Sequence, residues 1–331
     1  MNISVIGSGS WGTALTLLLC GNGHRVCLWS YREEESAILK KERENKALLP
    51  GVSFGDADIT FTSDISFAAN FGEIIVSAVP SKAVAETARL LKIADGKTIV
   101  NVSKGIDEES LSRISEVFKD ALPSSDIAVL SGPSHAEEVA RKIPTTNVIS
   151  CENPDKIKLL QDIFTSDNFR VYTNDDMIGV ELGGALKNAI ALCAGVVDGL
   201  GYGDNTKAAL MTRGLHEITR LGVTLGAKRE TFLGLTGIGD LIVTCTSMHS
   251  RNRRAGILIG QGKTLSQALK EVNMTVEGVG AIRAAHKLSS LHNVNMPIIN
   301  AAYSVLFEDA NPREAVLDLM TRGKKSEVDL F

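Results

Sequence analysis

The feature that most restricts the fold is a glycine-rich loop close to the N-terminus. Residues 3–6 predict a short buried strand and residues 13–20 predict a helix, with three closely spaced glycines between them. In such a G-x-G-x-x-G loop Gly7 permits a tight turn, Gly9 lets backbone N–H groups approach a pyrophosphate, and Gly12 lets the helix pack on the strand. The start of the helix adds partial positive charge. The loop therefore predicts dinucleotide binding, with a tight strand–helix turn that binds nothing as the alternative.

The end of the second predicted strand bears on the choice of nucleotide. Residues 25–30 predict this strand, and an NAD enzyme normally carries Asp or Glu near its end to hold the ribose 2′-hydroxyl. This chain has Tyr31 and Arg32 there. Because arginine can pair with a 2′-phosphate, the pattern favours NADPH over NADH. Use of both nucleotides is the alternative. The alternative is that Arg32 only begins a charged helix over residues 32–43.

Strand and helix signals then alternate as far as residue 173. The predicted strands are residues 59–62, 73–79, 98–102, 127–131, 147–150 and 169–173, and the predicted helices are residues 82–93, 109–121, 136–142 and 154–164. This alternation predicts a mainly parallel, doubly wound sheet, in which ligands bind at the carboxyl ends of the strands. Lys104, Gly132 and Ser134 follow two of these strands and are candidates for ligand contact. A solvated surface position is the alternative for Lys104.

Beyond residue 174 only helices are predicted. They span residues 179–200, 206–225, 250–259, 264–271, 278–291, 297–307 and 312–319. A chain of 331 residues exceeds the ~250–300 residues at which single cores stop growing, so two domains are expected. The prediction is an α/β Rossmann-like doubly wound sheet that binds NAD(P) over residues 1–175. An all-α C-terminal domain for substrate binding and catalysis follows over residues 176–331.

Composition narrows the partners. The net charge of -4 gives no reason to expect a nucleic-acid partner. The five cysteines are scattered, odd in number and without C-x-x-C spacing, which predicts neither a disulfide framework nor a zinc site, and no metal is expected. The N-terminus lacks the features of a signal peptide, and no apolar stretch is expected to reach the ~18 residues of a membrane span. A cytoplasmic protein is therefore expected.

One lysine lies in surroundings that do not suit a surface lysine. If residues 179–200 form a helix, the neighbours of Lys187 on the same face are Ile190, Ala191 and the glycines Gly183 and Gly184. A buried ammonium must be paired or lose its proton, which makes Lys187 a candidate acid or base. The two glycines would let the nucleotide domain and substrate approach it. A lysine that extends from a buried helix to solvent is the alternative.

Two later segments offer partners for this lysine and for an anion. Asp240 lies among glycines and apolar residues, so it is either a carboxylate that pairs with Lys187 or the N-cap of a helix. The cluster Ser250, Arg251 and Asn252, with two further arginines behind it, concentrates donors at a predicted helix start. Such donors suit phosphate recognition. A solvated basic helix face is the alternative.

Several motifs together resemble those of one family. They are GSGSWGTAL at residues 7–15, VSKG at 102–105, SGPS at 131–134, GVELGGALKN at 179–188, GIGDLIVTC at 237–245, SRNRR at 250–254 and VEG at 276–278. In this order and over almost the whole length, they resemble the bacterial-type NAD(P)-dependent glycerol-3-phosphate dehydrogenases. The resemblance implies reversible NAD(P)H-dependent reduction of dihydroxyacetone phosphate to sn-glycerol 3-phosphate, for glycerophospholipid biosynthesis.

The resemblance also implies roles for individual residues. Lys187 would be the proton donor and acceptor, Lys104 would contact substrate and cofactor, and Asp240 would keep Lys187 oriented. The expected substrate contacts are Lys104, Gly132, Ser134, Lys187, Asn188, Asp240, Thr244, Ser250, Arg251 and Asn252. The expected cofactor contacts are Gly7, Gly9, Ser10, Trp11, Gly12, Tyr31, Arg32, Lys104, Ala136, Arg251, Thr275 and Glu277. The family often has histidine or arginine where this chain has Tyr31, which leaves the choice between NADPH and NADH open, and a homodimer is one option for the assembly.

Two other functions remain open on the sequence. A β-hydroxyacid dehydrogenase of similar layout would act on a carboxylate substrate, and the arginine cluster argues against it. A non-catalytic dinucleotide-sensing protein would not need Lys104, Lys187 and Asp240.

Overall fold

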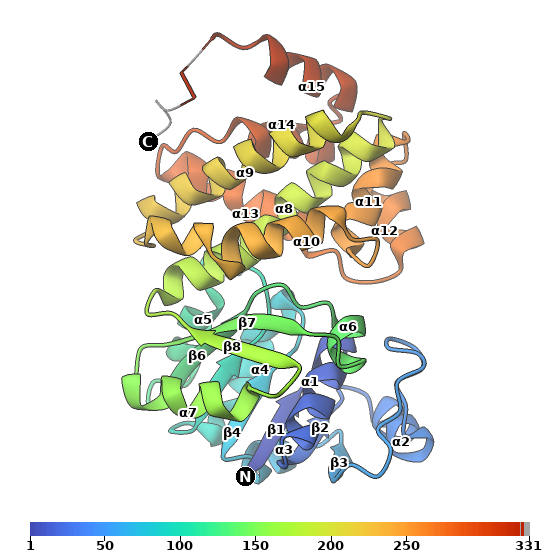
Figure 1. Ribbon diagram of the computed structural model, residues 1–331, viewed down its shortest axis with the longest axis vertical. Helices are drawn as coiled ribbons and strands as arrows, with labels where there is room; N and C mark the ends of the chain where they lie inside the picture. Colours follow the sequence, from blue (N-terminus) through green and yellow to red (C-terminus); the bar gives the residue numbers. More distant parts are fainter. Residues whose placement is uncertain (325, 328–331) are drawn as a thin grey trace. The chain divides into compact units, whose positions relative to one another are not determined.

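The chain forms two compact units that are not continuous in sequence. The computed structural model describes residues 1–324, 326 and 327. One unit comprises Met1–Asp107 with Ser112–Met177, and the other comprises Glu108–Leu111 together with the chain from Ile178 onward. The chain therefore passes between the units three times, whereas the sequence pattern suggested one boundary after residue 175 (Figure 1).

The first unit is built on an eight-stranded sheet with the order β3-β2-β1-β4-β5-β6-β7-β8 (Figure 1). Its strands are β1 Asn2–Ile6, β2 Arg25–Trp29, β3 Ile59–Thr62, β4 Ile74–Ser77, β5 Thr98–Asn101, β6 Asp126–Ser131, β7 Thr145–Cys151 and β8 Phe169–Thr173. Neighbouring strands are parallel except β6 and β7. The order of the first six strands is that of dinucleotide-binding folds, which confirms the predicted Rossmann-like sheet.

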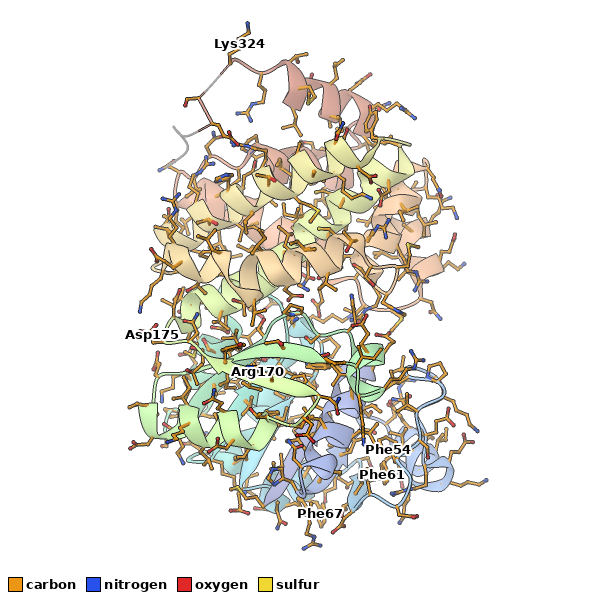
Figure 2. The ribbon with its side chains drawn as sticks, viewed as in Figure 1. Phe54, Phe61, Phe67, Arg170, Asp175 and Lys324 are labelled. Atoms are coloured by element: carbon orange, nitrogen blue, oxygen red, sulfur yellow. The ribbon has the colours of Figure 1, made fainter. Side chains whose placement is uncertain are left out.

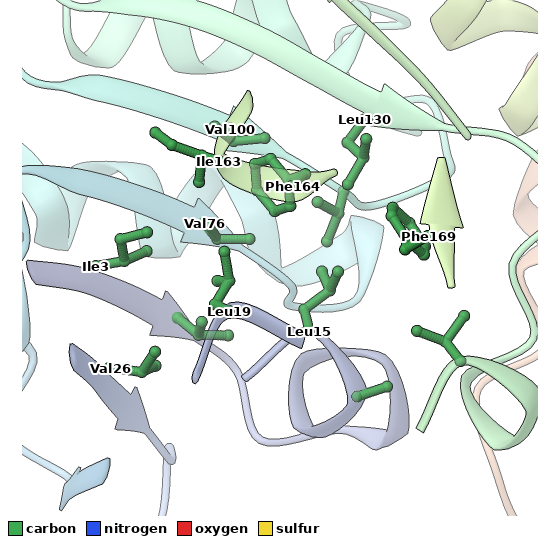
Figure 3. Packing of buried hydrophobic residues seen from close by; sticks show 14 of the residues in the cluster. Ile3, Leu15, Leu19, Val26, Val76, Val100, Leu130, Ile163, Phe164 and Phe169 are labelled. Carbon is green, nitrogen blue, oxygen red and sulfur yellow. The ribbon is translucent and has the colours of Figure 1, made fainter. Parts of the chain in front are cut away.

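Helices cover both faces of this sheet, as a doubly wound fold requires. They are α1 Ser10–Gly21, α2 Glu33–Glu42, α3 Ile65–Phe71, α4 Val84–Leu90, α5 Ile114–Ala121, α6 Ala136–Ala140 and α7 Pro154–Phe164. Strand β4 shows the division, because successive side chains of a strand point to opposite faces. Val76 packs with Leu15 of α1 and Phe164 of α7 (Figure 3), and Ile75 packs with Phe118 of α5 on the other face.

The first unit differs most clearly from the sequence prediction in α5, α3 and β7. The helix predicted over residues 109–121 begins only at Ile114, because residues 106–113 form a loop that an antiparallel bridge between Ile106 and Arg113 closes. Helix α3, which Asp64 caps through the N–H groups of Ser66 and Phe67, was not predicted because it is too short to show a clear periodicity. Strand β7 is longer than predicted and runs against β6.

The loop between α2 and β3 is irregular but closely held. Phe54 from this loop packs edge-on against Phe61 of β3, with ring centroids 5.3 Å apart (Figure 2). Arg43 donates to the backbone oxygens of Gly55 and Ala57. This loop also carries Asn45, which reaches back to the glycine-rich loop.

In the second unit the described elements beyond residue 177 are helical. They are α8 Met177–Gly199, α9 Asp204–Thr224, α10 Asp240–Thr246, α11 Arg251–Gly260, α12 Leu265–Val272, α13 Glu277–Leu291, α14 Pro297–Phe307 and α15 Pro312–Thr321. A 3-10 helix at Arg229–Leu233 and a π-helical turn at Leu235–Gly239 lead into α10. The all-α prediction is confirmed, although α10 itself was not expected.

Helix α8 is the central core helix of the second unit. By length and composition alone its 23 residues could cross a membrane, so the expectation that no stretch would reach that length was wrong. However, 94% of its apolar window is buried inside the structure. Its hydrophobicity is that of a helix surrounded by other helices.

The excursion Glu108–Leu111 packs on α13. A carboxylate oxygen of Glu108 accepts a hydrogen bond from the guanidinium of Arg283. A Cβ atom at Gly280 would lie 2.6 Å from the other carboxylate oxygen, so the helix leaves room for Glu108 at this point. Arg283 also lies over the ring of Phe307, 4.6 Å from its centroid.

Candidate active site

The glycine-rich loop has the geometry expected of a pyrophosphate site. Gly7 has a positive φ of 115°, and a Cβ atom at Gly12 would lie 1.9 Å from the carbonyl oxygen of Gly7. Both positions therefore require glycine for the fold itself. A Cβ atom at Gly9, the N-cap of α1, would meet no protein atom within 4 Å. Packing does not explain Gly9, whereas close approach of a ligand to the backbone does.

The start of α1 also suits an anion. No side chain caps this helix, and no acidic residue lies in its first turn, which begins with Ser10 and Trp11. The first turn of α1 itself therefore supplies no charge that would neutralise the positive end of the helix dipole. The residues present fit the diphosphate of a dinucleotide.

The residues after β2 are exposed. Tyr31 is 72% exposed and packs edge-on against Trp29. Arg32 is the N-cap residue of α2, which begins one residue later than predicted. Within the described residues its guanidinium makes no hydrogen bond or ion pair. Arg32 is thus a cation at the end of the second strand with no structural role for its charge.

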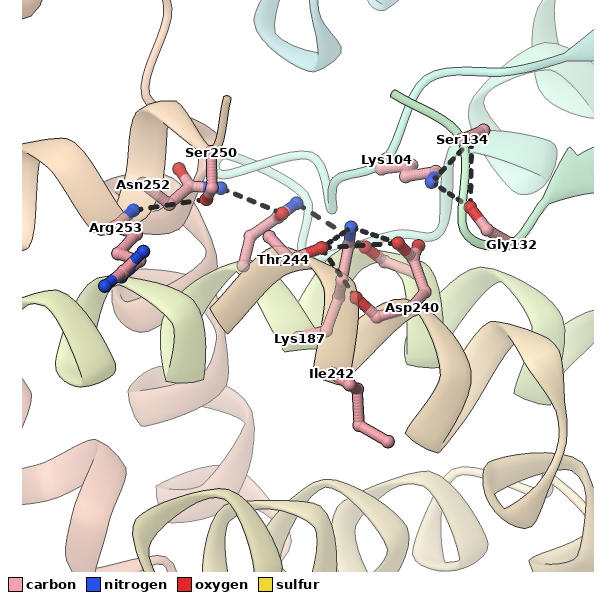
Figure 4. A network of polar contacts seen from close by, with 12 residues as sticks. Lys104, Gly132, Ser134, Lys187, Asp240, Ile242, Thr244, Ser250, Asn252 and Arg253 are labelled. Carbon is pink, nitrogen blue, oxygen red and sulfur yellow. Dashed lines mark hydrogen bonds and ion pairs between the residues drawn. The ribbon is translucent and has the colours of Figure 1, made fainter. Parts of the chain in front are cut away.

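Lys104 lies where the ends of two strands meet. Its Nζ donates to the carbonyl oxygen of Gly132 at 2.7 Å and to Oγ of Ser134 at 3.3 Å (Figure 4). The Ser134 hydroxyl donates to the same carbonyl at 2.9 Å. The structure brings together these three residues, which the sequence placed after β5 and β6. Ala136, two residues further on, begins α6 and is buried.

Lys187 forms a buried ion pair in the second unit. The residue is 5% exposed, and its Nζ lies 2.6 Å from Oδ1 of Asp240 and 2.5 Å from Oγ1 of Thr244 (Figure 4). The Thr244 hydroxyl donates to the carbonyl oxygen of Asp240 at 2.6 Å, so its oxygen accepts from the lysine. Lys187 does not extend to solvent, because it is buried. Asp240 is not an N-cap, because Gly239 is the N-cap residue of α10.

The π-helical turn before α10 places Asp240 against α8. A Cβ atom at Gly183 would lie 2.7 Å from the carbonyl oxygen of Thr236 in this turn. Gly183 therefore serves the packing of α8 on the turn, which corrects the expectation that its small size admits substrate. π-helical turns are rare, and those that are found frequently lie at functional sites.

The SRNRR segment begins α11 as predicted. Ser250 is its N-cap and accepts from the backbone N–H of Arg253 at 3.2 Å. The helix lies directly on α8, because a Cβ atom at Gly195 would be 2.0 Å from the carbonyl oxygen of Arg253. Gly256 of α11 makes an equally close approach to Leu192 of α8. Small residues on both helices thus hold the start of α11 close to the helix that carries Lys187.

Asn252 connects three helices. Its Oδ1 accepts from the backbone N–H of Gly278 at 2.9 Å, which fixes the orientation of the amide, and its Nδ2 donates to Oδ1 of Asn188 at 2.9 Å. The second Nδ2 proton has no acceptor among the described residues. Glu277 begins α13 beside this contact, and Thr275 lies two residues before it. Asn252 is therefore both a structural link and a remaining donor.

The arginines of the segment have different surroundings. Arg253 donates to Oδ2 of Asp198 at 2.7 Å, and Lys207 binds the other oxygen of Asp198 at the same distance. Arg253 is therefore used inside the fold. Arg251, which is partly buried, makes no hydrogen bond or ion pair with the residues that the structure describes. The pairing of Asp198 was not predicted: Arg253 lies 55 residues further along the chain, and Lys207 lies on the next helix.

Metal and thiol chemistry find no support in the described part of the chain. No group of three or more His, Cys, Asp or Glu residues is placed there to hold a metal ion. All five cysteines are free thiols. Burial raises the pKa of the Cys27, Cys193 and Cys245 thiols to about 12, so these thiols are unreactive at neutral pH.

Comparison with known proteins assigns the family. The chain matches the model of the NAD-dependent glycerol-3-phosphate dehydrogenase N-terminus at residues 2–157 and that of the C-terminus at residues 176–317. Glycerol-3-phosphate dehydrogenase (NAD(P)+) of Fusobacterium nucleatum is 53% identical over 332 residues, and that of Thermoanaerobacter sp. is 55% identical over 334 residues, with 99% of both chains covered in each case. The crystal structure of glycerol-3-phosphate dehydrogenase from Coxiella burnetii superposes with a TM-score of 0.93 at 38% identity and covers 97% of this chain and 99% of its own. The chain therefore belongs to the NAD-dependent glycerol-3-phosphate dehydrogenase family and is an oxidoreductase.

Proposed function

We propose that the protein catalyses the reversible NAD(P)H-dependent reduction of dihydroxyacetone phosphate to sn-glycerol 3-phosphate, which supplies glycerophospholipid biosynthesis in the cytoplasm. The names of its relatives support this reaction. The observation that carries it is the buried ion pair of Lys187 with Asp240, completed by Thr244. A carbonyl reduction needs a proton donor, and this pair holds an ammonium group away from bulk water.

Lys187 transfers the proton of the reaction. A nicotinamide nucleotide, when bound, would supply the hydride chemistry at the carbonyl carbon in both directions of the reaction. Lys187 donates a proton to the carbonyl oxygen as negative charge develops there, and takes it back in the reverse reaction. Asp240 and Thr244 fix the ammonium group in place. Acid catalysis of this kind contributes about 10²- to 10⁴-fold.

The other site residues position the substrate. Lys104, held by Gly132 and Ser134, polarises or orients the reacting group. Arg251 and Asn252 hold the phosphate, beside Ser250 at the helix start and Asn188 on α8. Binding energy gained at the phosphate then orients the carbonyl.

The glycine-rich loop and the start of α1 would hold the diphosphate of the nucleotide. Trp11, Tyr31, Ala136, Thr275 and Glu277 are the further contacts that the family resemblance implies. NADPH is preferred and NADH is accepted, because the guanidinium of Arg32, which pairs with none of the described residues, is available to a 2′-phosphate.

The test is NADPH oxidation in the presence of dihydroxyacetone phosphate, followed by absorbance. Lys187→Ala should lower kcat by about 10²- to 10⁴-fold, while NADPH still binds as in the wild type. Lys263→Ala is a matched control, since Lys263 also pairs with a carboxylate, that of Glu271, but on the surface. Turnover of Lys187→Ala close to that of wild type would remove Lys187 from this role. If NADPH is oxidised with a 3-oxo acid as substrate but not with dihydroxyacetone phosphate, the protein is instead a β-hydroxyacid dehydrogenase.

A further inference from the structure

We infer that Glu35 is a specificity-determining residue of the nucleotide site, which weakens the preference for NADPH and keeps NADH usable. This inference rests on the proposed nicotinamide site. It concerns the part of the site that would surround the adenosine ribose.

The glycine-rich loop and the start of α2 leave the sheet side by side. Strands β1 and β2 are parallel neighbours in which Ile6 pairs with Trp29. Immediately after these residues the N–H of Gly7 donates to the carbonyl oxygen of Trp29 at 3.1 Å. Because the loop follows β1 and α2 follows β2, the two segments lie at the same edge of the sheet. In dinucleotide-binding folds the adenosine ribose lies at this edge.

Glu35 is fixed against the loop by a direct hydrogen bond. The hydroxyl of Ser8, which stands between Gly7 and Gly9, donates to Oε1 of Glu35 at 2.8 Å. Ser8 is itself 4% exposed, and its carbonyl oxygen accepts from Nδ2 of Asn45 at 2.8 Å. The carboxylate of Glu35 is therefore held beside the two glycines that would carry the diphosphate.

Glu35 differs from the charged residues around it. Arg32, Glu33 and Glu34 are exposed, whereas Glu35 is partly buried. Exposed charges are screened by salt and water, and partly buried ones are screened much less. Of the three glutamates in the first turn of α2, Glu35 thus acts most strongly on a ligand at the loop.

The chemistry of the two nucleotides differs at the 2′ position only. A carboxylate can accept a hydrogen bond from the 2′-hydroxyl of NADH, which is the role that Asp or Glu at the end of the second strand plays in NAD enzymes. The same carboxylate repels the 2′-phosphate of NADPH. In this chain the strand end carries Tyr31 and Arg32, and the first turn of α2 supplies the acid instead. Arg32 and Glu35 therefore act in opposite directions.

Binding of nucleotide fragments tests this without the reaction. The dissociation constants of 2′,5′-ADP and 5′-AMP are measured by titration calorimetry for the wild type, Glu35→Gln and Glu34→Gln. Glutamine keeps an oxygen that can accept from Ser8, so Glu35→Gln removes mainly the charge. We expect it to tighten 2′,5′-ADP by about tenfold, which corresponds to ~1.4 kcal/mol, and to tighten 5′-AMP by a clearly smaller factor, because 5′-AMP carries only the phosphate that would lie at the glycine-rich loop. Glu34→Gln removes the same charge from an exposed position and should change neither constant by more than about twofold.

The outcomes separate this inference from the proposed function. If 2′,5′-ADP binds Glu35→Gln no more tightly than wild type, or Glu34→Gln tightens it equally, Glu35 is only a structural partner of Ser8. If kcat/KM for NADPH divided by kcat/KM for NADH also rises in Glu35→Gln, the same residue sets the nucleotide preference during turnover. If neither fragment nor whole nucleotide binds any of the three proteins, the proposed nucleotide site itself fails.

Discussion

At the scale of single residues, the buried ion pair of Lys187 and Asp240 is weak evidence for a stabilising role. Removing two charges from water carries a desolvation penalty that their attraction repays only with good geometry and further hydrogen bonds. Here Thr244 supplies one such bond. Apolar residues of the same size would often be as stable or more stable, so the pair is better explained by proton transfer.

Removal of one partner of this pair should be much worse than removal of both. Asp240→Asn leaves a buried ammonium without its carboxylate and should lower the free energy of unfolding by about 3–5 kcal/mol. The double variant Lys187→Met, Asp240→Leu should be inactive, but its free energy of unfolding should fall less than that of Asp240→Asn. Urea unfolding measures the free energy of unfolding of both variants. A double variant that is no more stable than Asp240→Asn would contradict this account.

Arg251 is expected to act on substrate binding. Because Arg251 makes no hydrogen bond or ion pair with the described residues, Arg251→Ala should change the melting temperature only slightly. It should raise KM for dihydroxyacetone phosphate by about tenfold or more, since charge-assisted bonds to phosphate contribute about 1.5–3 kcal/mol. Arg253→Ala provides the contrast, because Arg253 is bound to Asp198 and its loss should lower the melting temperature. An unchanged KM in Arg251→Ala would refute the phosphate assignment.

Glu217 makes stability depend on pH. Its carboxylate accepts from the N–H groups of Ile298 and Ile299 at the start of α14. Burial raises the pKa of Glu217 from 4.5 to about 7, although these two N–H groups act in the opposite direction. A raised pKa in the folded state means that the unfolded chain loses this proton first as pH rises.

The resulting stability is therefore greatest below about pH 4.5 and is lost as pH rises to about 7. The loss from this group should total about 3 kcal/mol, from the difference between its two pKa values. Glu217→Gln should flatten this part of the stability curve, measured by urea unfolding at a series of pH values. Glu230→Gln, at an exposed position of the same unit, should leave the slope as in the wild type.

At the scale of elements, the contact between α8 and α11 sets the distance from Lys187 to the residues proposed to bind the phosphate. Gly195→Ala would place a Cβ atom 2.0 Å from the carbonyl oxygen of Arg253 and force the helices apart. We expect a loss of stability of about 1–3 kcal/mol and a higher KM for substrate. Gly21→Ala is the control, because a Cβ atom there would meet nothing within 4 Å. Unchanged stability in Gly195→Ala would mean that the helices can separate freely.

The same elements show what the sequence could and could not predict. The glycine-rich loop and the helix around Lys187 have strong local signals, and both were predicted. The pairing of Asp240 with Lys187 was one of two alternatives, because nothing local decides between an N-cap and a partner 53 residues away. The bond between Ser8 and Glu35 was missed, since the motif directs attention to the strand end and a helical turn supplied the acid. Contacts of this kind depend on tertiary packing, which leaves no periodic pattern in the sequence.

At the scale of the whole molecule, each unit supplies a different kind of chemistry. The first unit collects the ends of its parallel strands, where backbone N–H groups and Lys104 can bind charged oxygens. The second unit surrounds α8 with helices, so that a lysine and its carboxylate are shielded from water.

The excursion of Glu108–Leu111 changes how this protein can be divided. A cut between Met177 and Ile178 would release an N-terminal fragment that still carries Glu108, the partner of Arg283 in the other fragment. Glu108 in one fragment could therefore still bind Arg283 in the other. Conversely, an exchange of the helical half between two relatives at residue 178 would combine the excursion of one protein with the α13 of another. For this chain, the natural module to transfer is the helical unit together with these four residues.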